Sequence, residues 1–333
     1  MKIGFFELEK WEEDYIKGKL KGHKLYFYNW PLDSKNANKI EDIDSAVCFI
    51  YSEMKKEVLS KLKKLKFITT MSTGFDHIDL DFCKQKGIKV SNVPFYGENT
   101  VAEFTFALIL ALSRRIHTAI EKTRKDDFSL NGLMGFDLKD KTLGVIGPGH
   151  IGQHVIRIAK GFEMNVLVYG IEKDLRLSKK FGFKWANNLN DLLKRSDIIT
   201  IHVPLVKETK HLINMDNIKE IKVGSYLINT SRGEIIDTSA LLYGLEKGII
   251  AGAALDVLEG ECGIKEEKEL LHGKKNICDL EIYCENRLLL KDKNVIVTPH
   301  CAFYTREALE RILDETVSNI MGFVKGKFRN RIV

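Results

Sequence analysis

Short apolar runs alternate with longer charged segments along the first 93 residues. The apolar runs predict strands over Lys2–Glu7, Lys24–Tyr28, Ala46–Tyr51, Phe67–Met71 and Lys89–Val93. The segments between them place apolar residues at helical spacing among lysines and glutamates. Such alternation is typical of a parallel sheet that is covered by helices. The pattern therefore predicts a complete small α/β domain at the start of the chain.

A second series of alternating runs begins at Lys141. It predicts strands over residues 142–146, 165–169, 197–202, 225–229, 251–257 and 294–298. Four of the five prolines lie at or just past the end of a predicted strand: Pro94, Pro148, Pro204 and Pro299. Proline stops the strand there and sets the loop. Because ligands bind at the carboxyl edge of doubly wound sheets, we expect the site at this edge. The charged stretch Cys262–Asp292 departs from the pattern and is predicted to be an insertion with some short helix.

A long helix is predicted between the two series. Thr100-Val-Ala-Glu103 has the spacing of a capping box, and the residues after it are apolar through Leu112. An apolar helix at the junction between two domains often packs in a subunit interface. We therefore expect a homodimer through this helix, with burial inside the monomer as the alternative.

Composition narrows the class of protein. A chain of 333 residues is too long for a single hydrophobic core and suits two domains. A content of 44% hydrophobic and 29% charged residues is typical of a globular protein. The densest basic stretch, residues 55–66, carries its apolar residues at helical spacing, which indicates a solvated helix face and not a nucleic-acid partner. The six cysteines show no metal-ligand spacing and indicate reduced thiols. With no signal peptide and no apolar run of membrane length, we expect a cytoplasmic protein without a membrane or metal partner.

The segment Thr142–Gly152 carries the clearest chemical signal. A strand pattern runs into Gly147-x-Gly149-x-x-Gly152, and a helical pattern follows. A dinucleotide site needs glycine for a tight turn, for close approach of the pyrophosphate and for packing of helix on strand. The helix N-terminus then presents N–H groups to the phosphates. The motif therefore predicts a dinucleotide cofactor.

Three charged or titratable side chains follow other predicted strands. Arg232 comes after Tyr226–Asn229, Glu261 after the strand that ends at Asp256-Val257, and His300 after Val295–Thr298. Taken singly, each is more often a surface ion pair or a structural residue. If the strands are parallel members of one sheet, however, all three emerge beside the glycine motif. An arginine that grips a carboxylate, and an imidazole that exchanges a proton and is held by a glutamate, make a hydride-transfer site.

Longer motifs resemble the D-isomer-specific 2-hydroxyacid dehydrogenases. They are V-P-F-Y-G-E-N-T-V-A-E (93–103), G-P-G-H-I-G (147–152), H-V-P-L (202–205), L-I-N-T-S-R-G-E-I-I-D (227–237), G-A-A-L-D-V-L-E-G-E (252–261) and V-T-P-H-C-A-F-Y-T (297–305). The resemblance implies that Arg232, Glu261 and His300 are the catalytic arginine, acid and histidine. It also implies two doubly wound parallel-sheet domains, Rossmann-like and flavodoxin-like, with a cleft between them. The substrate domain would comprise residues 1–98 and 304–333, and the dinucleotide-binding domain residues 99–303.

Within that family the chain is most similar to D-lactate dehydrogenases, including the vancomycin-resistance type. The similarity rests on S-T-G-F-D-H-I-D-L (72–80), the H-C-A-F-Y-T loop and D-V-L-E-G-E-C-G-I with the insertion after it. It implies substrate contacts from Tyr51, Thr73, Gly74, Tyr96 and Phe303. It further implies the contacts to the cofactor. His150 and Ile151 would contact the pyrophosphate, and Val203 and Pro204 would flank the adenosine with Thr209 nearby. Thr230 and Ser231 would lie near the nicotinamide ribose, and Asp256 would form a hydrogen bond to the carboxamide.

One position departs from the family pattern. Gly170 stands after the second strand of the dinucleotide domain, where an acidic residue would hold the adenine ribose. Without that carboxylate NADP is no longer excluded, and Lys173 and Arg176 are near enough in sequence to meet a 2′-phosphate. Glu172 is an alternative partner for the ribose. We expect NAD as the cofactor and leave NADP open.

The resemblance leaves three functions to compare. The first is reduction of pyruvate, or a slightly larger 2-oxo acid, to the D-hydroxy acid. The second is hydroxypyruvate or glyoxylate reduction. The third is a cofactor-sensing binding protein, as the family's transcriptional corepressors are.

Overall fold

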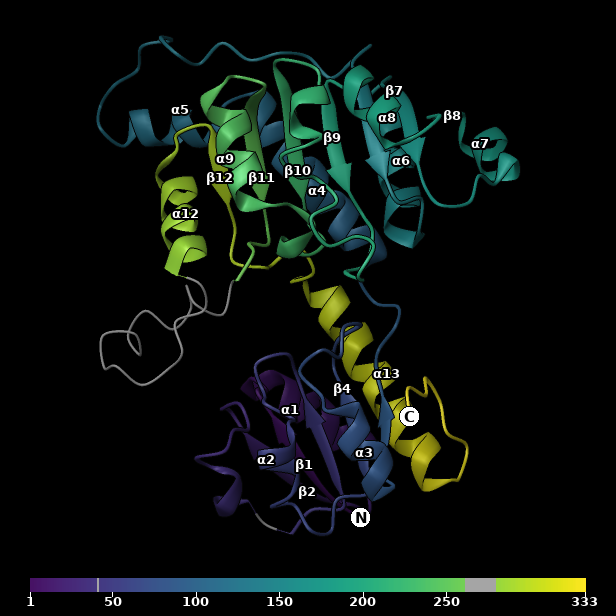
Figure 1. The fold of residues 1–333 in the computed structure, drawn as a ribbon. Helices are drawn as coiled ribbons and strands as arrows, with labels where there is room; N and C mark the ends of the chain where they lie inside the picture. Colours follow the sequence, from purple (N-terminus) through teal and green to yellow (C-terminus); the bar gives the residue numbers. More distant parts are fainter. Residues whose placement is uncertain (41, 261–279) are drawn as a thin grey trace. The chain divides into compact units, whose positions relative to one another are not determined.

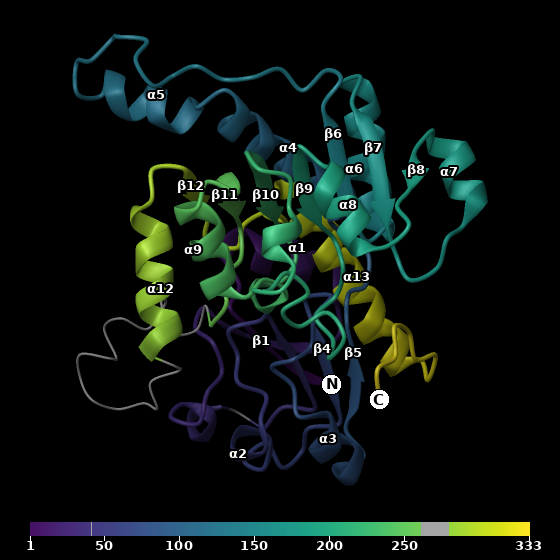
Figure 2. The same cartoon turned by 45° about the horizontal axis from the view of Figure 1, so that its top comes forward.

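The structure is a computed structural model that describes residues 1–40, 42–260 and 280–333. It divides into two compact units, residues 1–97 with 304–333, and residues 98–303. Each contains one sheet whose paired strands are all parallel, and Figures 1 and 2 show both units from two directions. The prediction of two doubly wound α/β domains is therefore confirmed.

The first unit contains a five-stranded sheet in the order β2-β1-β3-β4-β5. Its strands are β1 (Lys2–Phe6), β2 (Lys24–Tyr28), β3 (Ser45–Cys48), β4 (Phe67–Thr70) and β5 (Lys89–Ser91). Its helices are α1 (Lys10–Lys19), η1 (Ala37–Lys39), α2 (Lys56–Leu59), α3 (Leu80–Lys86) and α13 (Arg306–Val324). The strand order reverses between β1 and β3, which is where ligands approach doubly wound sheets of this kind.

Helix α13 brings the end of the chain back to this first sheet (Figure 1). The buried side chain of Asn319 donates to Asn92 O over 2.8 Å and to Thr69 Oγ1 over 3.2 Å. The ring of Phe323 stacks on that of Phe67 with 4.5 Å between centroids. Because these contacts join residues more than 200 positions apart, the first unit is discontinuous in sequence.

The second unit contains a seven-stranded sheet in the order β12-β11-β10-β9-β6-β7-β8. Its strands are β6 (Thr142–Ile146), β7 (Asn165–Tyr169), β8 (Lys184–Trp185), β9 (Ile198–Ile201), β10 (Ser225–Asn229), β11 (Ile250–Leu255) and β12 (Val295–Val297). Its helices are α4 (Glu98–Ser113), α5 (Ile116–Thr123), α6 (His150–Gly161), α7 (Leu175–Phe181), α8 (Leu189–Arg195), η2 (Ile218–Glu220), η3 (Gly233–Ile235), α9 (Thr238–Glu246) and α12 (Leu280–Lys291).

Two apolar cores cover the two faces of this sheet. Leu143 and Val145 of β6 pack with α4 and α6, whereas Ile146 packs with the core that contains α8 and α9. Figure 1 shows α8 and α9 in front of the sheet and α4 behind it. Side chains alternate between the two faces of a strand, so strands that are buried on both sides read as continuous apolar runs. This burial explains why the strands were predictable from sequence.

Two details differ from the predictions, and a third prediction is described only in part. β8 was not predicted, because two residues are too short to produce a periodic signal. Helix α4 begins at Glu98, so Thr100 lies buried in its first turn and is not the capping residue. The stretch from Cys262 to Asp292 was predicted to be an insertion with some short helix: its residues 280–291 form the helix α12, and its residues 262–279 lie outside the described part of the chain.

The apolar character of α4 also has a different explanation from the one predicted. Phe106, Leu108, Ile109 and Leu112 are buried against α6 and the sheet of the same unit. This burial accounts for the apolar sequence, so α4 itself gives no argument for a subunit interface. In the described residues, no helix is long and apolar enough to cross a membrane.

Candidate active site

The carboxyl ends of six parallel strands bring the predicted cofactor and catalytic residues of the second unit to one edge of its sheet. The loops in question follow β6, β7, β9, β10, β11 and β12. They carry Gly147–Gly152, Gly170, Val203–Thr209, Thr230–Arg232, Asp256 and His300 respectively. The predicted common edge is therefore present.

The turn after β6 has the geometry that a dinucleotide requires. Gly147 adopts a positive φ of 96°, and a Cβ there would lie 2.5 Å from the carbonyl oxygen of His202. A Cβ at Gly152 would lie 2.1 Å from the carbonyl oxygen of Gly147. Gly149, by contrast, is the N-cap of α6, and a Cβ there would meet nothing within 4 Å. Two glycines are thus required by packing, while the third leaves the helix N-terminus open to a phosphate group.

The loops after β9 and β10 are fastened to each other. Ser231 donates its hydroxyl to the carbonyl oxygen of Val203. Thr209 Oγ1 donates to Pro204 O over 2.6 Å and closes the turn within its own loop. Thr230 Oγ1 lies 3.0 Å from Thr105 Oγ1 of α4. These contacts fix the backbone beside the glycine turn, so the residues implied at the adenosine and ribose are held in one rigid group of loops.

The turn that carries Arg232 is shaped by the last residue of β10. Asn229 Oδ1 accepts from Ser231 N over 3.0 Å, and Asn229 Nδ2 donates to Arg232 O over 2.8 Å. An Asn side chain that bonds its neighbouring backbone in this way replaces a backbone turn. Arg232 Nη1 in turn donates to Ser231 O over 2.8 Å, and the arginine side chain is only partly buried.

Gly233 connects the Arg232 turn to the loop after β11. A Cβ at Gly233 would lie 2.0 Å from the carbonyl carbon of Leu258 and 2.3 Å from the amide nitrogen of Glu259. The two backbones are therefore in direct contact, and any side chain at this position would separate them. Since Glu261 follows Glu259 by two residues, the contact ties the arginine loop to the segment that leads to the predicted acid.

Asp256 holds the loop that carries His300. Its Oδ1 accepts from Thr298 Oγ1 over 2.5 Å and from Cys301 N over 3.0 Å, while Oδ2 accepts from Ala302 N over 2.8 Å. The Asp256 side chain is 1% exposed. His300 has a positive φ of 54°, a conformation that is uncommon for residues other than glycine. Three hydrogen bonds to a buried carboxylate therefore hold the histidine backbone in a strained conformation.

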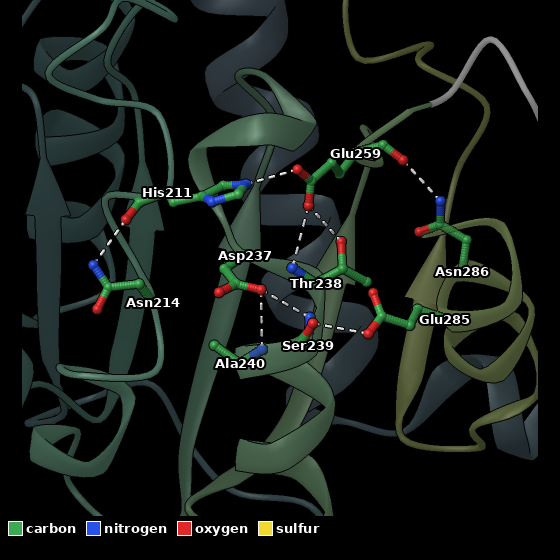
Figure 3. A network of polar contacts seen from close by, with 9 residues as sticks. All are labelled: His211, Asn214, Asp237, Thr238, Ser239, Ala240, Glu259, Glu285 and Asn286. Atoms are coloured by element: carbon green, nitrogen blue, oxygen red, sulfur yellow. Dashed lines mark hydrogen bonds and ion pairs between the residues drawn. The ribbon is translucent and has the colours of Figure 1, made fainter. Parts of the chain in front are cut away.

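Glu259 anchors the segment after Asp256 from the other side (Figure 3). Its Oε1 lies 2.6 Å from His211 Nε2, its Oε2 accepts from Thr238 Oγ1 over 3.0 Å, and its carbonyl oxygen accepts from Asn286 Nδ2 over 2.7 Å. The glutamate is 8% exposed. Glu261 itself lies outside the described residues, so its distance to His300 is not part of the structure.

The predicted substrate residues of the first unit follow the carboxyl ends of its own strands. Tyr51 comes after β3 and is half exposed, and Thr73 with Gly74 comes after β4. Thr73 Oγ1 donates to Val93 O over 3.0 Å, which joins this loop to the one that leads to Tyr96. These four residues therefore share the ligand edge of the five-stranded sheet. Phe303 is the last residue of the second unit and is partly buried.

Several residues that shape the site were not predicted. They are Asn229, Gly233, Thr298, Glu259 and His211. Asn229 had a local signal, because Asn at a strand end often forms a side-chain turn. The others act through contacts between loops that are distant in sequence. Among residues 1–40, 42–260 and 280–333, no group of three or more His, Cys, Asp and Glu side chains is arranged to hold a metal ion.

Comparison with known proteins agrees with this geometry. Residues 106–302 match the family model described as D-isomer specific 2-hydroxyacid dehydrogenase, NAD binding domain. The chain is 39% identical over 284 residues to an aromatic 2-oxoacid reductase of Clostridium sporogenes, which covers 84% of this chain and 82% of the relative. It is 34% identical over 336 residues to a glyoxylate reductase of Thermococcus litoralis, covering 99% of this chain and 91% of the relative.

A solved structure extends the similarity to the whole fold. The D-lactate dehydrogenase of Aquifex aeolicus in complex with NAD and lactic acid superimposes with a TM-score of 0.85 at 39% identity, covering 98% of this chain and 96% of that one. Residues 106–302 are accordingly an NAD-binding domain. The relatives carry three different substrate names, so the similarity leaves the substrate of this chain open.

Proposed function

The chain belongs to the D-isomer-specific 2-hydroxyacid dehydrogenase family, and from this premise we propose that it reduces pyruvate to D-lactate with a nicotinamide cofactor. One observation carries the proposal. The loops of Arg232 and His300 are fastened to the segment that begins at Asp256, beside a glycine turn that fits a dinucleotide. A cation for a carboxylate and an imidazole for a carbonyl oxygen are thereby held on the two loops that flank the segment after β11.

The proposed reaction assigns one task to each of three side chains. Arg232 binds the substrate carboxylate through its guanidinium fork and polarises the neighbouring carbonyl. His300 donates a proton to the carbonyl oxygen during reduction and removes it during oxidation. Glu261 holds the imidazole in place for that proton transfer. When bound, the reduced nicotinamide supplies the hydride that reduces the carbonyl carbon.

The proposed substrate side comes from the first unit and Phe303. The backbone amides near Thr73 and Gly74 would bind the carboxylate, and Tyr51, Tyr96 and Phe303 would surround the substrate side chain. Aromatic walls suit a methyl group or another small apolar group. Support comes from the loop geometry, because Asn92 Nδ2 donates to Thr73 O over 2.9 Å and so fixes the backbone of the first of these loops.

Glyoxylate or hydroxypyruvate reduction is the second candidate, and the relative from Thermococcus litoralis favours it. The test is a panel of pyruvate, 2-oxobutyrate, glyoxylate, hydroxypyruvate and phenylpyruvate, each with NADH and NADPH. The highest kcat/KM is expected with pyruvate or 2-oxobutyrate. A higher kcat/KM with glyoxylate or hydroxypyruvate would support the alternative. Turnover of none of them, with intact cofactor binding, would support a binding protein of the corepressor type.

We also propose a homodimer that associates through α5 and the residues after it. Ile116 and Ile120 are each 45% exposed, and Phe128, Leu130 and Met134 are 77%, 83% and 91% exposed. Exposed apolar side chains that gather in one segment are typical of an association surface. Leu130→Asp is expected to shift the protein toward monomers in analytical ultracentrifugation. Val223→Asp, at another exposed apolar residue (75% exposed), is the control that should stay dimeric.

A further inference from the structure

The end of β7 lies directly beside the glycine turn. Ile146 pairs with Tyr169 across the sheet, and Gly147 N donates to Tyr169 O over 2.9 Å. The residues just past the two strands are therefore close neighbours: Pro148 lies two positions after Ile146, and Gly170 follows Tyr169 directly. In dinucleotide domains the position after the second strand is where an acidic side chain binds the ribose 2′-hydroxyl and discriminates against a 2′-phosphate.

Pro148 occupies the space that a side chain at position 170 would need. A Cβ at Gly170 would lie 2.9 Å from Cδ and 3.2 Å from Cγ of Pro148, and 3.6 Å from Cζ3 of Trp185. Non-bonded carbon atoms have their optimal separation at about 3.5–4.0 Å. An ordinary side chain end could rotate away, but the proline ring is bonded to its own backbone nitrogen and cannot.

The turn that carries Pro148 can shift to make room only at the cost of contacts of its own. Gly147 already contacts the backbone of His202, since a Cβ there would lie 2.5 Å from its carbonyl oxygen. The carbonyl oxygen of Pro148 accepts from Gln153 Nε2 over 3.1 Å, which fastens it to α6. Movement of the turn would therefore disturb the phosphate-binding backbone itself.

The charges after Gly170 do not replace a fixed acidic residue. Asp174 caps α7 and lies 3.3 Å from Arg176 Nε, so its carboxylate is neutralised within its own turn. Glu172 and Lys173 are exposed neighbours of opposite sign. The local charge is balanced, and neither an anionic 2′-phosphate nor a neutral 2′-hydroxyl is strongly favoured.

We propose that Pro148 and Gly170 form a matched pair that excludes an acidic side chain from the ribose position, so that the site binds NADP as well as NAD. The proposal rests on the nicotinamide-dependent function proposed above, but it concerns cofactor binding and not the identity of the 2-oxo acid. It predicts that a substitution at position 148 or at position 170 alone does not make the site selective for NAD. Selectivity requires a smaller residue than proline at position 148 and a carboxylate at position 170 in the same protein.

The experiment measures dissociation constants of NADH and NADPH without substrate, by the fluorescence of the bound nicotinamide. The proteins are the parent, Pro148→Ala, Gly170→Asp and the double variant. In the parent the two constants are expected to agree within about tenfold, because no fixed carboxylate repels the 2′-phosphate. Pro148→Ala should leave their ratio within about threefold of the parent, and Gly170→Asp should weaken both cofactors together, because the displaced turn contacts both.

The double variant is the decisive protein. Its preference for NADH should exceed the product of the two single effects by about tenfold or more, because only there can the carboxylate reach the ribose. If Gly170→Asp alone shifts the ratio as far as the double variant does, Pro148 is not the obstacle and the proposal is wrong. A parent that binds NADH more than about a hundredfold more tightly than NADPH would also overturn it.

A smaller substitution keeps the test valid if the aspartate variants fail to fold. Gly170→Ala is expected to lower the unfolding temperature, and Pro148→Ala should restore it in the pair. Additive effects of the two alanines would contradict the steric argument. Failure of the dehydrogenase proposal is recognised separately, because a protein that binds both cofactors but turns over no 2-oxo acid refutes that function and leaves the matched pair intact. Binding of neither cofactor would overturn both proposals.

Discussion

The carboxylate of Asp256 is expected to be the main support of the His300 loop, and Asp256→Asn tests this. An asparagine can keep its oxygen toward Thr298 and Cys301, but it then turns its NH₂ group toward the amide of Ala302. One charge-assisted hydrogen bond is lost and one buried N–H is left without an acceptor. Together these should lower the free energy of unfolding by about 2–4 kcal/mol. For a unit of this size the corresponding fall in unfolding temperature is roughly 5–15 °C.

The same bonds outweigh the cost of the histidine backbone. A left-handed conformation at a residue other than glycine costs on the order of 1–3 kcal/mol, whereas hydrogen bonds to a charged group contribute about 1.5–3 kcal/mol each. With three such bonds the loop stays in place, and with one fewer the margin becomes small. Asp256→Asn should therefore also lower kcat, because His300 no longer stays in one position.

Thr298 separates this explanation from a direct role of Asp256 at the cofactor. Thr298→Val removes the hydroxyl at constant shape, and Thr298→Ser keeps the hydroxyl as the matched control. The first should lower both unfolding temperature and kcat, and the second should lower them much less. In a double-mutant cycle with Asp256→Asn, a coupling of about 1 kcal/mol is expected. Additivity within about 0.3 kcal/mol, or a valine variant that equals the parent, would refute the reasoning.

Four further outcomes are expected from single changes. Arg232→Lys keeps the charge but loses the fork, so kcat/KM should fall on the order of 10²-fold, and a value within about threefold of the parent would remove Arg232 from the site. His300→Ala should abolish most pyruvate reduction at every pH, because no other acid is proposed at the carbonyl oxygen, and a variant that keeps more than about a tenth of the parent kcat would remove His300 from that role. Gly233→Ala places a methyl group against the backbone of the neighbouring loop and should cost on the order of 4 kcal/mol in chemical denaturation, so a parent-like midpoint would show that the loops can separate. Burial lowers the pKa of His202 from its ordinary value of 6.5 to about 3. Between pH 6.5 and pH 3, the imidazole is therefore protonated in the unfolded chain but not in the folded chain. The free energy of unfolding should therefore fall by about 1.4 kcal/mol per pH unit below 6.5 on account of this group, and His202→Gln should reduce that slope.

The sequence determined the elements and the edge at which the site lies. Strands such as β6 and β10 were predicted within a residue, because a strand that is buried on both faces must be a continuous apolar run. Parallel strands all end at one edge, so Arg232 and His300 could be placed there before any pairing was known. The glycines at 147 and 152 were equally local, because the turn and the helix packing occur within six residues.

Only the tertiary structure decided which neighbouring loops touch. Three such contacts join residues that lie 22 or more positions apart. Pro148 crowds Gly170, Gly233 contacts the loop after β11, and Asp256 accepts a hydrogen bond from Thr298. The apolar sequence of α4 could not separate burial in the monomer from an interface for the same reason, since a buried helix and an interface helix have the same pattern until their neighbours are known. Periodicity reports which side of an element is apolar, but the identity of the partner follows from the order of the strands in the sheet. That order is fixed by packing across the whole unit, and no local stretch of sequence contains it.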